Sequence, residues 1–336
     1  MSTVSNSLPR TRRSVLRASL LTLAAASAAL AAGTAHAYPD KPVTLFVGFA
    51  AGGSADTVAR ALAEEMSKTL GQRVIVENRP GASANIASAA VLAAPADGHS
   101  LLFAGLTLAT NPPLIGVKYD PLTALAMVTQ ITSVPVVMVA SSKGSLQSPG
   151  DVVALGKKTP GGLKVASGGL GTSSHLAPEL FFQSQQLPYL HVPYKGGAPA
   201  NVALLGGEVD LMFDLMSGTL RGFVDAGQVR PLAVMQEGRI EALPNVKSAK
   251  EWGLPPSTFM RSWQGIAVKA GTPAPVVAQI HKAVLAAANT PSFRARVWQL
   301  GSEVVTSRAP AEFDALYRAE LTRWAALVKA ANIKVE

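Results

Sequence analysis

The residues best suited to chemistry are the run Ser173-Ser174-His175, which follows a glycine-rich segment that starts at Ser167. With Asp214 or Asp56 as a third member, this run has the residue types of a serine hydrolase triad. Adjacent residues at a helix start point in different directions, however, so nearness in sequence does not place a serine within hydrogen-bond reach of His175. A hydrolase therefore remains an alternative, and a binding site is the favoured interpretation.

Other catalytic constellations are missing from the sequence. It contains no G-x-S-x-G, H-E-x-x-H or G-x-x-x-x-G-K-[ST] motif and no complete G-x-G-x-x-G motif. His99, His191 and His281 are far apart and lack the spacing of metal ligands. The chain has no cysteine, which excludes disulfides, thiolate metal sites and cysteine nucleophiles. We expect no metal and no cofactor.

Two glycine turns, each followed by a helix, are the elements that would position a ligand. The first follows a predicted strand, Val43 to Phe49, and leads into a helix that Ser54 could cap and that ends at Gly71. The second is the segment from Ser167 to His175. A glycine turn at a helix start directs unpaired backbone N–H groups, and the positive end of the helix dipole, at an anion. The plain alternative is that Gly52-Gly53 is only a tight strand-to-helix connection.

The order of elements predicts an α/β protein. Strands are expected at Arg73 to Glu77 and Leu101 to Gly105, with a helix at Gly81 to Ala94 between them. This alternation indicates a parallel sheet, in which ligands bind beyond the carboxyl ends of the strands. The turn after the first strand and the loop Leu106 to Asn111 should therefore share one crevice.

The rest of the chain predicts a second lobe. The extended apolar segments Ala124 to Ala140 and Phe259 to Val268 would be two crossings between lobes, and hence a hinge. The first lobe is expected at residues 38–135 plus 262–336 and the second at 136–261. Further elements are expected as follows: helices at 149–158, 199–205, 272 onward and 310–331, a short helix within 244–254, and strands at 163–166, 209–213 and 229–235.

Several segments resemble the tripartite tricarboxylate transporter receptors, also called Bug receptors. The resemblance rests on six runs: Tyr38 to Pro42, Val43 to Gly71, Glu77 to Gly81, Ser167 to His175, His191 to Ala200 and Gly206 to Asp214. It implies a periplasmic binding protein-like (type II) clamshell of two doubly wound lobes joined by a two-segment hinge. It further implies a monomer that captures a small carboxylate, uses no cofactor and delivers the ligand to a two-component integral-membrane permease. A sensor module feeding a regulatory partner is the alternative function.

The ligand carboxylate is expected to lie among backbone amides and small hydroxyls of the two turns, with Asp56 and His175 supporting the loops. Leu215 stands where the receptors often carry a polar residue. Together with Leu106, Leu108, Ala109 and Leu170, it favours a monocarboxylate or simple dicarboxylate with an apolar body, unless these side chains point into the lobe cores. The expected ligand-binding residues are Phe49, Ala51, Gly53, Ser54, Asp56, Leu108, Asn111, Ser167, Gly171, Thr172, Ser173, His175 and Asp214.

The N-terminal 37 residues have the pattern of an export signal. Four arginines precede an alanine-rich apolar segment, and Ala35-His36-Ala37 is a small-x-small cleavage site. Thr11 to Arg17 resembles the twin-arginine motif, which leaves that route and the general secretory route both open. Without this segment the formal charge falls from +9 to +5, and the remaining charges form no basic run. A nucleic-acid partner is therefore not expected, and the periplasm is the expected location.

Overall fold

The computed structural model describes residues 38–330 and residue 333, so the expected signal peptide at 1–37 lies outside the described residues. From Lys41 onward the described residues form a compact unit that contains every helix and strand of the described part. Its strands join in one mixed sheet in the order β2-β1-β3-β9-β4-β7-β5-β6, with β10 and β8 also paired to β4. None of the described helices is long and apolar enough to cross a membrane.

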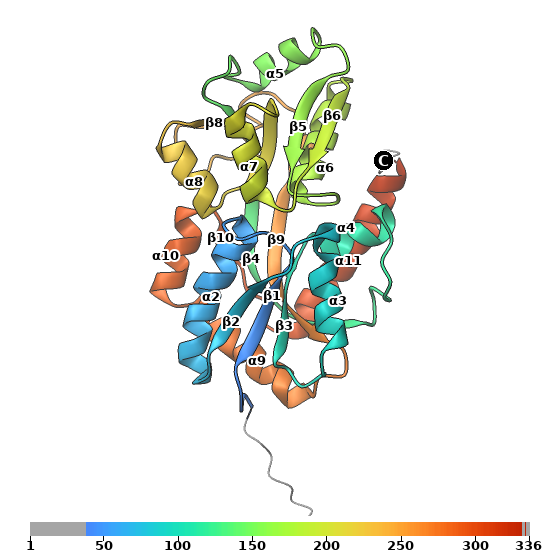
Figure 1. Ribbon diagram of the computed structural model, residues 1–336, viewed down its shortest axis with the longest axis vertical. Helices are drawn as coiled ribbons and strands as arrows, with labels where there is room; N and C mark the ends of the chain where they lie inside the picture. Colours follow the sequence, from blue (N-terminus) through green and yellow to red (C-terminus); the bar gives the residue numbers. More distant parts are fainter. Residues whose placement is uncertain (1–37, 331–332, 334–336) are drawn as a thin grey trace, which may run out of the picture. The chain divides into compact units, whose positions relative to one another are not determined.

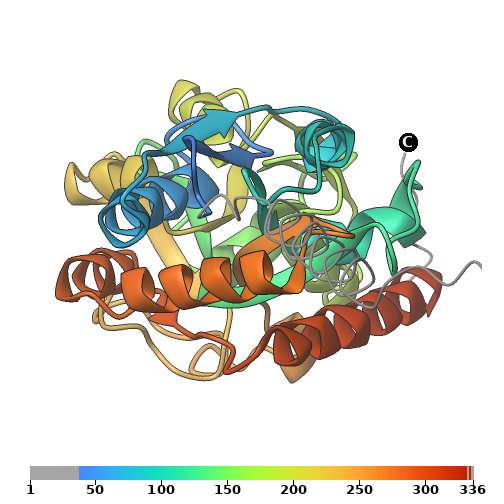
Figure 2. The same ribbon diagram turned by 90° about the horizontal axis from the view of Figure 1, so that it is seen from below.

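The first lobe surrounds one end of this sheet. Helices α2, α9 and α10 pack together on one side of its strands, and α3, α4 and α11 lie on the other (Figures 1 and 2). Its elements are β1 (Val43–Val47), α2 (Ser54–Leu70), β2 (Val74–Asn78), η1 (Ala82–Ala84), α3 (Asn85–Ala93), β3 (Ser100–Gly105), α4 (Thr107–Leu114), α9 (Ala274–Ala288), α10 (Pro291–Gln299), β10 (Glu303–Val304) and α11 (Pro310–Ala330).

The second lobe is built on β5, β6, β7 and β8, and α6 and α7 pack on β5 and β7 (Figure 1). Its elements are α5 (Pro149–Gly156), β5 (Leu163–Ser167), α6 (Ser173–Ser184), β6 (Tyr189–Pro193), α7 (Gly197–Gly206), β7 (Leu211–Leu215), α8 (Gly218–Asp225), β8 (Val229–Val234) and η2 (Pro256–Thr258). Both lobes alternate strands and helices, as the sequence predicts.

Two long strands, β4 (Leu125–Ser141) and β9 (Arg261–Lys269), connect the lobes (Figure 1). From Leu125 to Pro135, β4 pairs with β9, and from Val136 onward it pairs with β7 and, one residue later, with β8. Pro135 lies at this change of partner. Because proline has no backbone N–H to donate to a neighbouring strand, it is tolerated best where the pairing changes. The lobe boundaries at 135/136 and 261/262 remain a prediction.

The structure corrects several expectations about individual elements. The sheet is mixed, because β9 is antiparallel to β3 and to β4. The expected loop Leu106 to Asn111 is mostly helix α4, which tolerates its two prolines because they lie in its last turn. The segment 244–254 contains turns and no helix. Helices α8 and α10 were not predicted. Ser54 is the first residue of α2, and Gly53 is its N-cap.

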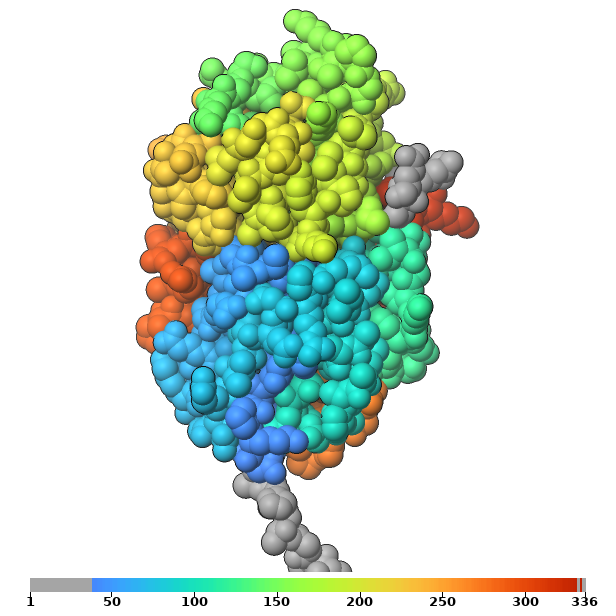
Figure 3. All heavy atoms as spheres, in the orientation of Figure 1, coloured from blue at the N-terminus to red at the C-terminus, as the bar shows by residue number. Residues whose placement is uncertain are grey.

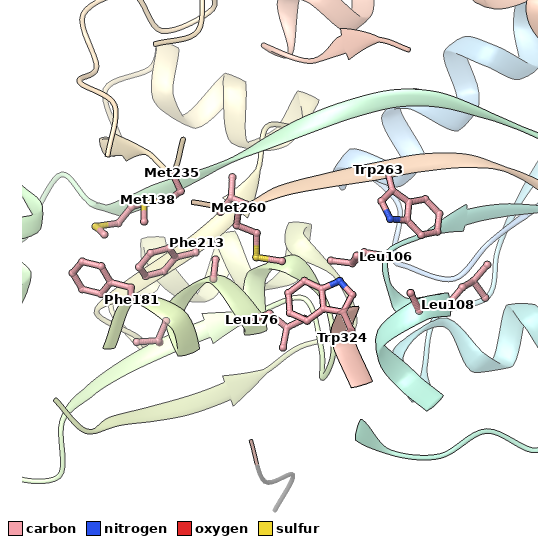
Figure 4. Close-up of a cluster of buried hydrophobic side chains, with 14 of the residues drawn as sticks. Leu106, Leu108, Met138, Leu176, Phe181, Phe213, Met235, Met260, Trp263 and Trp324 are labelled. Atoms are coloured by element: carbon pink, nitrogen blue, oxygen red, sulfur yellow. The ribbon is translucent and has the colours of Figure 1, made fainter. Parts of the chain in front are cut away.

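A buried apolar cluster continues from one lobe into the other. Figure 4 shows Phe181, Phe213 and Met138 at one end of the cluster and Leu108 and Trp263 at the other. Each of these five side chains is at most 5% exposed. Because the interior between the crossing strands is densely packed, the strands hold the loops at their ends in defined positions.

Candidate functional site

A cavity of about 80 Å³ lies between the lobes, beyond the carboxyl ends of β1, β3, β5 and β7. Such a space holds several waters or a small organic ligand. Six of the thirteen residues expected around the ligand line it: Phe49, Gly53, Ser54, Thr172, Ser173 and Asp214. The two glycine turns therefore do face one space, one from each lobe.

Four helices begin at this cavity. The first residues of α2, α4, α6 and α7 line it, namely Ser54, Thr107, Ser173 and Gly197. The residue that precedes each of these helices makes no side-chain capping hydrogen bond. Of the helices that start elsewhere, α5, α8 and α10 are capped by Ser148, Ser217 and Thr290, whereas α3 and α9 also lack a side-chain cap. First-turn N–H groups at the cavity are thus left for a ligand, and the four dipoles favour an anion.

Side-chain charge contributes little to this preference. None of the residues lining the cavity, all within the described part of the chain, is lysine, arginine or histidine, and Asp214 is the one carboxylate among them. Among the described residues no group of three or more acidic or histidine side chains could hold a metal ion. The site is therefore one where backbone dipoles and hydroxyl groups, rather than an arginine clamp, would bind an anion.

The relatives of this chain agree with that geometry. Residues 58–333 match the model of the family described as the tripartite tricarboxylate transporter family receptor. The chain belongs to this family. It is 34% identical to the periplasmic binding protein BugD, whose structure covers 89% of this chain and all of its own, with a TM-score of 0.84.

Two further relatives have structures with a carboxylate bound. MatC from Rhodopseudomonas palustris, solved with malate, is 32% identical with a TM-score of 0.82, over 87% of this chain and 100% of its own. The R. palustris protein Rpa4515, solved with adipate, is 31% identical with a TM-score of 0.84, over 88% of this chain and 99% of its own. The family and these structural neighbours are substrate-binding proteins.

In this receptor Asp56 holds the first glycine turn from behind. Its carboxylate accepts hydrogen bonds from the backbone N–H of Gly52 at 2.9 Å and from the side chains of Asn78 at 2.9 Å and Arg60 at 3.1 Å. Burial alone would raise the pKa of Asp56, but these hydrogen bonds outweigh it and hold the pKa below its usual value. Asp56 does not line the cavity, so its contacts fit a supporting role.

His175 holds the second glycine turn in a similar way. Its Nδ1 accepts a hydrogen bond from the backbone N–H of Gly171 at 3.1 Å, which places its proton on Nε2. Its ring stacks on His191 at 4.2 Å between centroids, and His191 Nε2 lies 2.6 Å from Ser167 Oγ. Burial lowers the pKa of His175 to about 3, with the neighbouring His191 adding to the effect, and burial lowers that of His191 to about 4.

The hydrolase alternative gains no support from these contacts. Ser174 Oγ accepts a hydrogen bond from the N–H of Gly168 and lies 2.9 Å from Thr172 Oγ1, so its hydrogen-bond partners do not include His175. His191 Nε2 does lie 2.6 Å from a serine hydroxyl, but that serine is Ser167, which is fully buried and was not proposed as the nucleophile. The residues proposed as a triad are therefore not arranged as one among the described side chains.

Seven of the thirteen expected ligand residues are not in the cavity wall. Four of them are Asp56, Ser167, Gly171 and His175, and the other three are Ala51, Leu108 and Asn111. Ala51 is exposed in the turn before α2, and Leu108 is part of the buried cluster. Asn111 donates to the carbonyl of Ser83 at 2.8 Å and to Asn85. Ligand contact by these residues remains a prediction without geometric support.

The leucines that suggested an apolar ligand are divided between cavity and core. Leu106 and Leu215 line the cavity, and Leu106 also belongs to the buried cluster, as do Leu108 and Ala109. Leu170 is not among the lining residues. The aromatic rings of Phe49, Phe103 and Trp263 add to the apolar part of the wall. The expectation of an apolar ligand body thus depends on fewer leucines than the sequence suggested, and on more aromatic residues.

The sequence interpretation missed the contribution of β9. Ser262, Trp263 and Gln264 all line the cavity from this crossing strand. Gln264 is 3% exposed, accepts from Thr132 Oγ1 at 2.9 Å and donates to Ser54 Oγ at 3.2 Å, which leaves the Ser54 hydroxyl proton free for a ligand. No local signal singles it out, because Arg261, Ser262 and Lys269 are also polar residues of β9.

The lobes contact each other directly around the cavity. Ala50 N donates to Lys195 O at 3.0 Å, and Thr110 Oγ1 donates to Gly171 O at 2.6 Å. On the face seen in Figure 3, atoms of the second lobe abut those of α2 and its preceding turn, and the cavity is hidden. The lobes are thus in contact on this side of the cavity.

Proposed function

We propose that this receptor binds a small carboxylate in the cavity between its lobes and delivers it to a two-component membrane permease. The observation that carries the proposal is the meeting of four uncapped helix starts in a cavity without basic side chains. Malate and adipate in two relatives of the same fold support a carboxylate, and the family description supports a transporter partner. We expect the chain to be exported, cleaved near Ala37 and monomeric.

The carboxylate is expected to accept hydrogen bonds from backbone N–H groups at Gly53, Ser54 and Ser173 and from the hydroxyls of Ser54, Thr107 and Ser173. The opposite part of the wall is apolar, with Phe49 and Leu215 among its residues. Additional hydroxyl or carboxyl groups on the ligand would face this wall and lose hydrogen bonds to water, at about 1–3 kcal/mol each. We therefore expect a monocarboxylate or a simple dicarboxylate.

Ligand capture is proposed to involve closure about the two crossing strands. Each lobe supplies two of the four helix starts that line the cavity. The full set of N–H groups therefore surrounds the ligand only when the lobes meet. The change of partner along β4 at Pro135 supports a hinge at residues 135/136, with 261/262 as its counterpart on β9.

A thermal-shift screen tests the function. The panel contains malate, adipate, aromatic monocarboxylates, citrate and amino acids, with uncharged amides of the same acids as matched controls. A true ligand at 100 times its dissociation constant adds about 2.7 kcal/mol to the free energy of unfolding. Stabilisation by acids and not by their amides supports the proposal. Stabilisation by citrate alone contradicts the apolar wall argument, and stabilisation by amides contradicts an anion site.

A further inference from the structure

The cavity contains one feature that an anion site alone does not explain, which is the carboxyl group of Asp214. This residue lies on β7, is 6% exposed and lines the same space as the four helix starts. Its Oδ2 accepts a hydrogen bond from the side-chain amide of Asn201 at 2.8 Å. Its two oxygens lie so close to Gly197 that a Cβ there would be 2.7 and 3.0 Å from them.

In the described part of the chain, no positive side chain lines the cavity beside this carboxyl. The elements packed against β7 are β4, β5, α6 and α7, and their titratable residues are Lys164, His175 and Glu179. Lys164 is exposed on β5, and Glu179 accepts a hydrogen bond from Tyr189, so neither lines the cavity. His175 is neutral above about pH 3, because burial and His191 lower its pKa.

We propose that Asp214 carries a proton when the cavity is occupied and donates a hydrogen bond to a carboxylate oxygen of the ligand. This inference rests on the proposed function, since it requires an anionic ligand. Two carboxylates that share one small site cannot both be ionised without strong repulsion, and a shared proton removes that repulsion. The same proton converts Asp214 from an acceptor, which would repel the ligand, into a donor.

Burial makes this proton easy to hold. It raises the pKa of Asp214 to about 7, against the opposing effect of the hydrogen bonds from Asn201 and from the backbone of Leu215. An anion in the cavity raises the value further. The alternative, an ionised Asp214 that pairs with an ammonium group of the ligand, would place a cation in front of four positive helix ends, which the dipoles oppose.

The consequence is that binding takes up a proton. At pH 8 a group with a pKa of about 7 is about one-tenth protonated, so binding should take up about 0.9 proton per ligand. The dissociation constant should rise by up to about tenfold per pH unit above pH 7. An ammonium ligand would give the opposite sign: proton release, with affinity that rises with pH.

The test is isothermal titration calorimetry with the carboxylate that binds best in the panel, starting from malate and adipate. Titrations at pH 8 in phosphate and in Tris, which differ in ionisation enthalpy, report the protons taken up. In Asp214→Asn the amide keeps a donor without a titratable proton, so we expect binding to persist with no uptake and no dependence on pH. The control is Asp314→Asn, which removes a carboxylate paired with Arg318 on α11.

Uptake close to one proton in the wild type, retained in the control, supports the inference. Binding of a carboxylate with no uptake, or with proton release, overturns it and leaves the proposed function in place. Absence of binding by any carboxylate of the panel overturns the proposed function and this inference with it. The wild-type titrations decide between these outcomes even if Asp214→Asn does not fold.

Discussion

Thr219 at the start of α8 donates a hydrogen bond to the backbone carbonyl of Gly52, 167 residues earlier in the chain, at 2.8 Å. Gly52 is thereby held from both sides, because its N–H donates to Asp56 in the first lobe. Its φ of +85° belongs to the left-handed region, and a Cβ would lie 2.8 Å from Thr219 Oγ1. Glycine is needed here both for its backbone conformation and for the close approach of the second lobe.

The substitution Thr219→Val should weaken ligand binding. It keeps the shape of the side chain and removes a hydrogen bond that can form only when the lobes meet. One such bond contributes about 0.5–1.5 kcal/mol, so the dissociation constant should rise about 2- to 13-fold, mainly through faster release. Stopped-flow release kinetics measure this. Thr322→Val is the control, because Thr322 bonds only within α11. Equal release rates in both variants and wild type would show that the contact does not stabilise the closed form.

The substitution Gly197→Ala should damage the site without straining the backbone. Gly197 has no left-handed φ, but its new Cβ would lie 2.7 Å from Asp214 Oδ2 and force the carboxyl or the start of α7 to move. Such overpacking costs about 1–3 kcal/mol, and we expect a comparable loss of ligand affinity. Gly206→Ala in the same helix is the matched control, because its Cβ would meet no atom nearer than 3.9 Å. Both are compared by calorimetric titration, and similar affinities for the two variants would contradict the prediction.

Most of the fold follows from local patterns in the sequence. The apolar residues of the strand at Val43–Val47 are buried, and so are Val58, Leu62 and Met66 of the stripe that the spacing predicts on α2. Leu70, the last residue of that predicted stripe, is only half-buried. Helix α4 was not predicted, because Pro112 and Pro113 indicate that no helix continues through them. Both prolines are tolerated here because they lie in the last turn of the helix. The antiparallel direction of β9 depends on how the chain returns to the sheet after the second lobe. No local sequence pattern predicts that direction.

The site was harder to predict than the fold. Residues at the two glycine turns were identified because glycines and hydroxyls before a helix have a recognisable physical use. Which side of each turn faces the ligand depends on tertiary packing, so Leu108 and Asn111 were expected at the site and are not in its wall. Gln264 and Trp263 reach the cavity through strand pairing across the hinge, and their position could be known only once β9 was placed between β3 and β4.

The buried histidines should make the protein sensitive to acid. Folding lowers the pKa of His191 to about 4 by burial, below the unfolded value of about 6.5. Its contribution to stability is therefore present above pH 6.5 and is lost as the pH falls from 6.5 toward 4. Between pH 7 and pH 5 the wild type should lose about 1–2 kcal/mol of unfolding free energy relative to His191→Gln, which stays neutral.

Urea unfolding of both proteins at several pH values measures this difference. The titration of Asp214, whose pKa is raised in the folded state, changes the free energy of unfolding in the opposite direction between pH 7 and pH 4. This effect is present in both proteins and cancels in their difference. The lost contact with Ser167 gives an offset that does not change with pH. A difference between the two proteins that is the same at pH 5 and pH 7 would show that folding does not lower the pKa of His191.

Ligand binding should make the receptor more compact, because the cavity wall comes from both lobes and the contacts of Thr219 with Gly52 and of Thr110 with Gly171 join them. Small-angle scattering of the protein with and without saturating ligand measures the radius of gyration, which we expect to fall. To raise the closed fraction from about 1% to about 99%, the ligand must bind the closed form more tightly than the open form by about 5.5 kcal/mol. A weaker preference for the closed form gives a proportionally smaller fall in the radius of gyration. At the same ligand occupancy, Thr219→Val should leave more molecules in the open form. If the radius is the same with and without a ligand that calorimetry shows to be bound, the receptor is rigid and presents its ligand without closing.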